Sequence, residues 1–420
     1  MTALRILAAI VGVSSLSAQT HVWVVNDDGP ADFADLQPAI DAASSGDILL
    51  VKRGTYGGMD VAGKTLTIQA DRNALGTVVV SVEATGASRN RIRDLAPGQS
   101  VRVRGLLLAD SPSGLELTNN AGTVWVEDCQ VSCLTEGSEN PGLSVSDSSA
   151  VVLIRSSFLG ADGADCDDDF ATAVPGPGLR VANAQVHAFG CSFQGGSAGT
   201  YVDFCCPFMC LPVDGADGIR SSSAQDFLFL SGCTVQGTYG SSEFFEVGCF
   251  SGSAGAGLVA AGAASVLDSV VQGGPAKTGF CAAAAGPDTV GPVDFLPGRA
   301  MQMQLDSPVR ENGTIDVAFF GPAGAQVWMR ARLNPEPAFV GAMGSLLVPE
   351  PGALQFMGTI GSTGVLFRAI PLGNLPPGVQ GRVIFAQGLY LDMSARLAQQ
   401  HPTRTILGEG SMLVELDEAP

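Results

Sequence analysis

The chain has 420 residues and a formal net charge of −19 at pH 7, with 41 acidic and 22 basic side chains. This acidic balance excludes nucleic acid and anionic membrane surfaces as partners, because both repel a negative protein. The length exceeds what one compact core usually supports, so we expect two structural units. The 54 glycines and the small charged fraction favour a fold of stacked strands and tight turns.

Residues 1–18 predict a secretory signal peptide. Arg5 precedes the apolar run 6–13, which is too short to span a bilayer, and small residues such as Ser17 and Ala18 follow it. The alternative is a buried N-terminal strand or helix. Export predicts a secreted or cell-envelope protein, with no transmembrane segment after cleavage. In that compartment disulfides between the ten cysteines can persist.

A capping helix is expected near the mature N-terminus. Leu36, Ile40 and Ala43 share one helical face, which can cover the open end of a stack of strands. The mostly apolar segment 46–51 follows it.

Two short patterns recur further along the chain and interleave. The first is an apolar strand that turns through a polar residue, as in 126–131, 154–159, 188–193, 230–235 and 266–271. The second begins with glycine, as in 114–117, 142–145, 178–181, 218–221 and 257–260. A constant pattern with a variable remainder indicates parallel strands stacked into a β-solenoid and joined by loops of different length.

Stacking places the residues of one repeat position in a file, about 4.8 Å apart along the axis. We expect one file to point inward: Cys129, Ser157, Cys191, Cys233 and Ser269. A free cysteine packs as a small hydrophobe. We therefore interpret these three thiols as structural and reject a catalytic role for them.

These repeats, together with Asp28-Gly29-Pro30-Ala31-Asp32-Phe33 and Gly54-Thr55-Tyr56, resemble the pectin-lyase-like right-handed parallel β-helix superfamily. The resemblance covers about residues 22–290. It implies an all-β fold, with a right-handed parallel β-helix over residues 19–292 and an N-terminal capping helix. Family members usually bind substrate on the side of the long loops. The Gly-His-Gly and Asn-Thr-Asp segments of polygalacturonases are missing, so the resemblance implies no particular reaction.

Residues 293–420 predict a smaller, antiparallel β-sandwich-like domain. Alternating stretches such as 314–319, 326–330 and 382–387 are separated there by Gly/Pro turns. The part from 370 to 392 resembles small C-terminal β-domains of exported, planctomycete-type bacterial proteins.

The long loops leave the stack at matching places, so we expect them on one side of the solenoid. They span 134–141, 160–177, 195–217, 237–256 and 273–295. Disulfides that brace these loops are the expected role of seven cysteines, because closing a long loop is costly without packing. A zinc site at the three neighbouring cysteines of the third loop is an alternative, although the usual paired spacing is missing. The seven are Cys133, Cys166, Cys205, Cys206, Cys210, Cys249 and Cys281.

Residues 162–169 form the densest acidic segment. Clustered carboxylates suit Ca²⁺, and Asp165, Asp167 and Asp169 are the candidate ligands of a calcium ion. A solvated acidic loop is one alternative. A catalytic carboxylate pair is the other, with Asp168 and Asp217 as candidates.

Arg180 and Arg220 occupy the same outward position on successive turns. Two guanidinium groups about 5 Å apart repel by roughly 1 kcal/mol in water, a cost that loop aspartates can offset. The pair can form such ion pairs, or it can anchor a uronate, since arginine binds carboxylates bidentately. His187, expected outward on the same side, joins them as a substrate-binding candidate, and the two arginines are also candidate catalytic residues.

Three functions are consistent with this sequence. The first is a non-catalytic exported protein that binds a polysaccharide or another cell-envelope component through its loop side. The second is a polysaccharide lyase or glycoside hydrolase that acts on an acidic polysaccharide. The third is a structural repeat protein whose loops only protect the solenoid.

Overall fold

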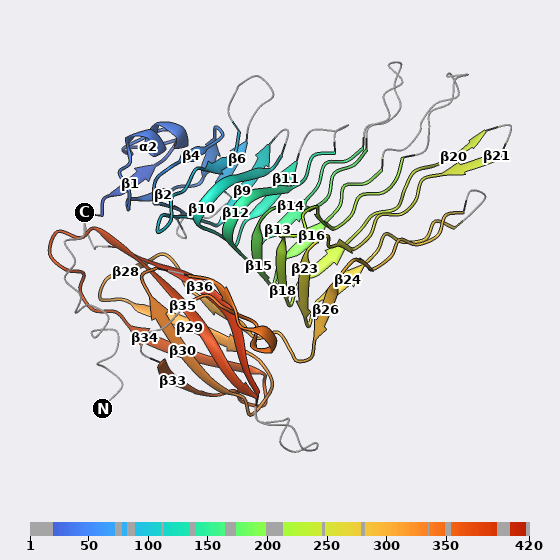
Figure 1. Ribbon diagram of the computed structural model, residues 1–420. Helices are drawn as coiled ribbons and strands as arrows, with labels where there is room; N and C mark the ends of the chain where they lie inside the picture. Colours follow the sequence, from blue (N-terminus) through green and yellow to red (C-terminus); the bar gives the residue numbers. More distant parts are fainter. Residues whose placement is uncertain are drawn as a thin grey trace.

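The computed structural model describes residues 20–71, 78–81, 89–110, 113–133, 139–163, 174–198, 213–245, 248–278, 282–334, 336–348, 354–392 and 404–416. They form the right-handed parallel β-helix that the sequence predicts, followed by two smaller packed sheets. Figure 1 shows the solenoid with the second unit lying along one of its sides. No helix in the described part of the chain is long and apolar enough to cross a membrane.

Each turn of the solenoid contributes a strand to three faces. Face 1 contains β4 (Asp60–Ala62), β7 (Arg91–Arg93), the first halves of β10 (Leu115–Glu127) and β12 (Leu143–Ile154), β14 (Leu179–Ala182), β17 (Ile219–Ser221), β22 (Leu258–Val259) and β25 (Thr289–Val290). Face 2 contains β1 (Val22–Val25), β2 (Ile48–Val51), β5 (Leu66–Ala70), β8 (Ser100–Arg104), the second halves of β10 and β12, β15 (Gln185–Phe189), β18 (Phe227–Ser231), β23 (Ala263–Leu267) and β26 (Val293–Leu296). Face 3 contains β3 (Gly54–Tyr56), β6 (Val78–Ser81), β9 (Leu106–Asp110), β11 (Gln130–Cys133), β13 (Ser157–Leu159), β16 (Ser192–Gln194), β19 (Thr234–Gln236) and β24 (Val270–Gln272).

A single residue with positive φ makes the corner between face 2 and face 3 on successive turns. These residues are Gly105, Asp128, Arg155, Gly190, Gly232 and Asp268, with φ between 45° and 76°. Glycine reaches this region at no steric cost, and aspartate tolerates it better than most residues. The corner therefore sets the register of the turns.

This register corrects one residue of the expected inward file. Ser156, not Ser157, lies beside Cys129, because the Ser156 hydroxyl accepts a hydrogen bond from the Cys129 amide. Ser157 points outward and is exposed. Cys129, Cys191 and Cys233 are buried in the solenoid interior as expected. Burial raises the pKa of the Cys129 thiol to about 12, which agrees with a structural role.

A short helix, α2 (Leu36–Ala42), covers the N-terminal end of the solenoid (Figure 1). The Asp35 carboxylate accepts a hydrogen bond from the first helical amide. At the other end of the helix, the Lys64 ammonium donates to the carbonyl oxygens of Ile40 and Ala43. A cation at this end also suits the helix dipole. The predicted capping helix is confirmed.

The long loops leave the solenoid at the corner between face 3 and face 1. Their described first and last residues, which we call the legs of the loops, run outward together as one stack (Figure 1). Backbone bonds run from leg to leg: the Ala161 amide donates to Asn140, Gly176 to Ala161, and Gly196 to Gly176. A Cβ at Gly176 would overlap the Asn140 carbonyl, so glycine is required for this close approach. One pair of legs ends in a hairpin of β20 (Ser242–Phe245) and β21 (Gly248–Ser251).

The C-terminal unit is a sandwich of two sheets, as predicted. The smaller sheet contains β27 (Gln302–Leu305), β29 (Thr314–Phe320) and β34 (Val365–Pro371). The larger one contains β28 (Val309–Arg310), β36 (Arg404–Leu416), β35 (Gly381–Asp392), β30 (Gln326–Arg332) and β33 (Leu354–Thr359). A small pair, β31 (Ala338–Phe339) and β32 (Ser345–Leu346), is joined by the 3-10 helix η3 (Gly341–Met343) and contacts face 2, where Phe339 packs against Phe227 and Phe229.

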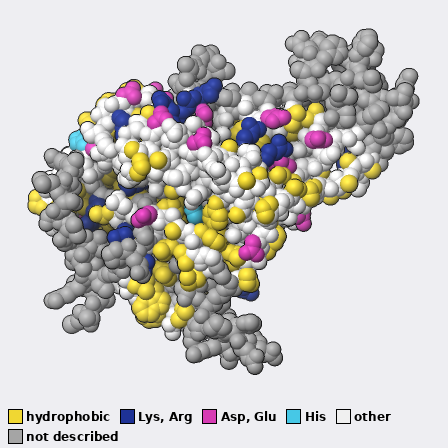
Figure 2. All heavy atoms as spheres, viewed as in Figure 1, with side chains coloured by type: hydrophobic (Ala, Val, Ile, Leu, Met, Phe, Trp, Pro, Cys, Tyr) yellow, Lys and Arg dark blue, Asp and Glu magenta, His cyan; other side chains and the backbone are white. Residues whose placement is uncertain are grey.

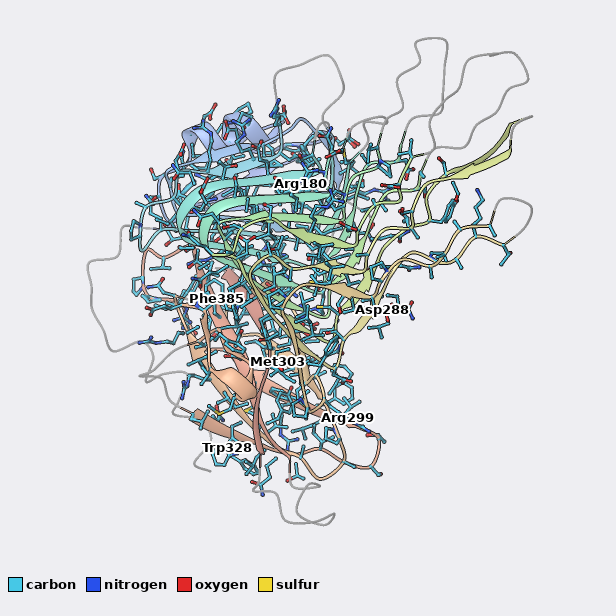
Figure 3. All side chains as sticks on the ribbon, turned by 45° about the vertical axis from the view of Figure 1, so that its right-hand side comes forward. Arg180, Asp288, Arg299, Met303, Trp328 and Phe385 are labelled. Carbon is cyan, nitrogen blue, oxygen red and sulfur yellow. The ribbon has the colours of Figure 1, made fainter. Side chains whose placement is uncertain are left out.

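The sandwich covers the outer side of face 2, and one buried hydrophobic cluster contains side chains of both units. Trp125 of face 2 packs edge-on against Phe385 of β35, with ring centroids 4.8 Å apart. The Arg102 guanidinium lies 4.7 Å from the centre of the same Phe385 ring. Figure 3 places Phe385 and Met303 at this junction.

Buried charges cross the same junction. Arg155 bonds to Asp128 at 2.8 Å and pairs with Glu127 of the solenoid and with Glu409 of β36. It also donates to the Met303 carbonyl oxygen at 2.9 Å. Burial raises the pKa of Glu409 to about 8, because desolvation outweighs the attraction of Arg155, and the nearby Glu127 carboxylate adds to the shift. Glu127 and Glu409 both pair with Arg155, and Arg104 lies 3.5 Å from the Glu127 carboxylate.

Replacing Phe385 by alanine tests the aromatic contact. Because Phe385 is fully buried, we expect Phe385→Ala to lower the free energy of unfolding by about 3–5 kcal/mol, measured by chemical denaturation. The control is Phe367→Ala, which removes a ring that is 70% exposed and should cost less than about 0.5 kcal/mol. Equal losses in the two variants would contradict the packing described.

The Glu409 carboxyl gives a pH dependence with a defined sign. Its pKa is near 4.5 in the unfolded chain and about 8 when folded, so between these values the folded state binds the extra proton. The stability that this group contributes is complete below about pH 4.5 and is lost as the pH rises through 8. We expect the wild-type free energy of unfolding to fall relative to that of Glu409→Gln between pH 5 and pH 9. Parallel profiles would contradict this account.

Candidate functional site

The outer side of face 1 carries a file of polar and charged residues set by the strand register. Successive turns align Arg91 with Glu116, Glu116 with Ser144, Ser144 with Arg180, and Arg180 with Arg220. The file begins with opposite charges on neighbouring turns and ends with two adjacent arginines. The predicted pairing of Arg180 and Arg220 is therefore present, on β14 and β17.

The two arginines differ in how they are held. Arg220 Nε donates to the Asp217 carboxylate at 2.6 Å, and its side chain is 43% exposed. Arg180 donates to the Glu139 carbonyl oxygen, lies 3.8 Å from the Glu139 carboxylate, and is 34% exposed. The Glu139 side chain is itself 59% exposed, so this second pairing is open to water and to exchange with another anion.

The environment of Arg180 disfavours its charge. Its pKa is lowered because burial removes water from the guanidinium, and the Glu139 carboxylate only partly offsets this. Arg220 adds like-charge repulsion in the same direction. An anion bound across the two guanidinium groups would relieve that repulsion.

Asp217 joins this site to the stacked loop legs. One of its carboxylate oxygens accepts from Arg220, and the other accepts from the Ala256 amide at 2.8 Å. The side chain is buried. Both oxygens are thus engaged in fixing Arg220 and the returning leg, which is a positioning arrangement.

A second basic group on face 1 was not identified from the sequence. Arg89 and Arg91 lie 3.7 Å and 3.2 Å from the Glu116 carboxylate, and Arg93 bonds to Asp60 at 3.0 Å. The signal in the sequence is the alternation of arginines at 89, 91 and 93, which places all three on one side of a strand. Figure 2 shows Lys and Arg side chains gathered in two groups on the solenoid, one of them where Figure 1 labels β14.

His187 is not part of this surface, which corrects its expected role in binding substrate. It points outward from face 2, where the C-terminal sandwich covers it, and it is only 1% exposed. Its Nδ1 lies 2.7 Å from the Ser345 hydroxyl, and no described residue bonds to Nε2. Burial lowers the pKa of His187 to about 4, so the ring is neutral at pH 7.

Several candidates lie outside the described residues: Asp165, Asp167, Asp168, Asp169, Cys166, Cys205, Cys206, Cys210, Cys281 and the side chain of Cys249. Residues 1–18 lie outside them as well. Cys133 is described and is buried at the end of β11. The part of the chain that the structure describes contains no disulfide and no cluster of three metal-ligating side chains.

Comparisons with known proteins add little to this geometry. No family model matches the chain, and no curated protein matches it. A crystal structure of pectate lyase Pel9A aligns over 60% of this chain and 70% of that one, with 12% sequence identity and a TM-score of 0.28. At that TM-score the alignment carries no argument, and the β-helix is established by the strand pairing of this chain.

The buried position of His187 can be tested by pH. Between about pH 6.5 and pH 4 the unfolded chain binds a proton on this ring that the folded chain does not. The stability contributed by neutral His187 is therefore lost as the pH falls through that window. We expect His187→Gln to flatten this acid-side slope in denaturation curves. An unchanged slope, or a loss of ligand binding in this variant at pH 7, would contradict the buried assignment.

Proposed function

We propose that this protein is an exported binding protein for an acidic polysaccharide, with Arg180 and Arg220 as the anchor for its carboxylates. One observation carries the proposal: the two arginines are aligned in register on neighbouring turns and are both partly exposed. Neighbouring strands lie about 4.8 Å apart. Two guanidinium groups at that spacing can hold one carboxylate between them, or two carboxylates of one chain.

The net charge of the whole protein bears on where the affinity for an acidic polysaccharide must come from. A net charge of −19 repels a polyanion at long range, so affinity depends on direct contact with a local positive group. Asp217 fixes Arg220 from the buried side, and among the described residues the acidic partner of Arg180 is the exposed Glu139. A uronate carboxylate that replaces Glu139 would gain two charged donors at the cost of a weak surface pair.

The binding proposal is tested with polygalacturonate as the probe, in affinity electrophoresis and calorimetry of the full exported chain, with and without calcium. We expect Arg180→Gln and Arg220→Gln each to weaken binding at least tenfold, because each removes a bidentate carboxylate contact. The matched control is Arg299→Gln, at an exposed position after β26 that Figure 3 labels. Unfolding curves check that the variants remain folded. Equal binding by all three variants would overturn the proposal.

A second candidate, a polysaccharide lyase, is favoured by one observation. Arg180 and Arg220 are aligned and partly exposed, so the pair could also neutralise a uronate carboxylate and so stabilise the negative charge that develops when a lyase removes the neighbouring proton. The same samples are therefore incubated with the polymer and checked for chain shortening. Depolymerisation that disappears in Arg180→Gln would replace the binding proposal by the enzymatic one.

A further inference from the structure

Face 3 differs in chemistry from face 1. Its last five strands, β11, β13, β16, β19 and β24, contain no Asp, Glu, Lys, Arg or His at any position. The chain as a whole has a net charge of −19, and face 1 carries the arginine groups described above. Over these five turns, face 3 is therefore a strip of surface without charged side chains, whereas face 1 on the same turns carries Arg180 and Arg220.

The outward residues of these strands form two straight files in register. The first file passes from Gln130 through Ser157, Ser192 and Thr234 to Val270. All five of these side chains are exposed. Because the strands are parallel and in register, this surface repeats regularly from turn to turn.

The second file lies two residues further along each strand. It passes from Ser132 through Leu159, Gln194 and Gln236 to Gln272. The two files are about 6.6 Å apart along a strand, and neighbouring turns are about 4.8 Å apart. Together they present hydroxyl and amide groups on a grid about 20 Å long.

This grid suits a neutral ligand that is rich in hydroxyl groups. Serine and threonine hydroxyls and glutamine amides can each donate and accept hydrogen bonds, as sugar hydroxyls can. Covering neutral polar groups that find new partners costs far less than covering charged ones. We propose that face 3 is a binding surface for an extended, uncharged polysaccharide, separate from the arginine site on face 1.

A second copy of the chain fits this face less well. Stable interfaces between copies have an apolar centre. Only two exposed large hydrophobic side chains lie in these files, Leu159 at 39% and Val270 at 51%, and they belong to different files. The regular hydroxyl and amide groups would stay incompletely paired in such an interface. The uncharged and polar character of the face therefore favours a carbohydrate.

The test uses retention of the full exported chain on microcrystalline cellulose and on chitin, in low salt and in 0.5 M salt. The variant Gln194→Glu/Gln236→Glu places two carboxylates at exposed positions of face 3. Gln225→Glu, at an exposed position on the turn between face 1 and face 2, is the matched control. Sedimentation of each protein alone measures self-association. Denaturation curves confirm that the variants are folded.

We expect the wild-type chain to be retained on at least one of the two polymers, with little dependence on salt. The double variant should be retained at least tenfold less, and Gln225→Glu should behave like the wild type. The inference is overturned by no retention of the wild type, by equal retention of the double variant, or by a dimer that only the double variant disrupts. The Arg180→Gln variant, which should lose only polygalacturonate, keeps failure of this inference distinguishable from failure of the proposed function.

Discussion

The stacking of turns in register is the constraint on which the rest of this structure depends. Each strand satisfies its backbone groups on the turns before and after it, so a turn cannot shift without breaking bonds on both sides. The corner residues with positive φ, from Gly105 to Asp268, hold that register. Residues of one repeat position therefore form files, and a file has a single chemistry only if the sequence keeps it from turn to turn. The arginine pair on face 1 and the hydroxyl and amide files on face 3 both follow from this.

The three outer faces differ in how far they are covered and in their charge. Face 2 is covered by the C-terminal sandwich through Trp125, Phe385 and the buried charges around Arg155. Face 1 is exposed and carries charged side chains, and the last five strands of face 3 are exposed and carry none. The stacked loop legs extend from the corner between the two open faces, and Asp217 ties them to Arg220. Two exposed surfaces of different chemistry therefore remain on the solenoid.

Much of this fold could be predicted from the sequence, because a repeat reveals itself by comparison with its own copies. The residue that lies beside Cys129 could not be predicted. Ser156 and Ser157 are both serine, and only the positive φ of Arg155 decides which of them points inward. His187 was misplaced because the sandwich over face 2 is a long-range contact. A signal was present: segments such as 151–154 and 227–230 are apolar at every position, which is typical of strands buried on both sides. The pairing of Arg180 with Arg220 could be predicted, because it depends only on the spacing of the repeats.

The central proposal is that face 1 binds an acidic polysaccharide through Arg180 and Arg220. The most direct measurement is chemical modification of arginines by phenylglyoxal, mapped by mass spectrometry with and without polygalacturonate. The account predicts that the polymer protects Arg180 and Arg220 while the reactivity of the exposed Arg299 stays unchanged. Unchanged reactivity of Arg180 and Arg220 at a polymer concentration that saturates binding would contradict it.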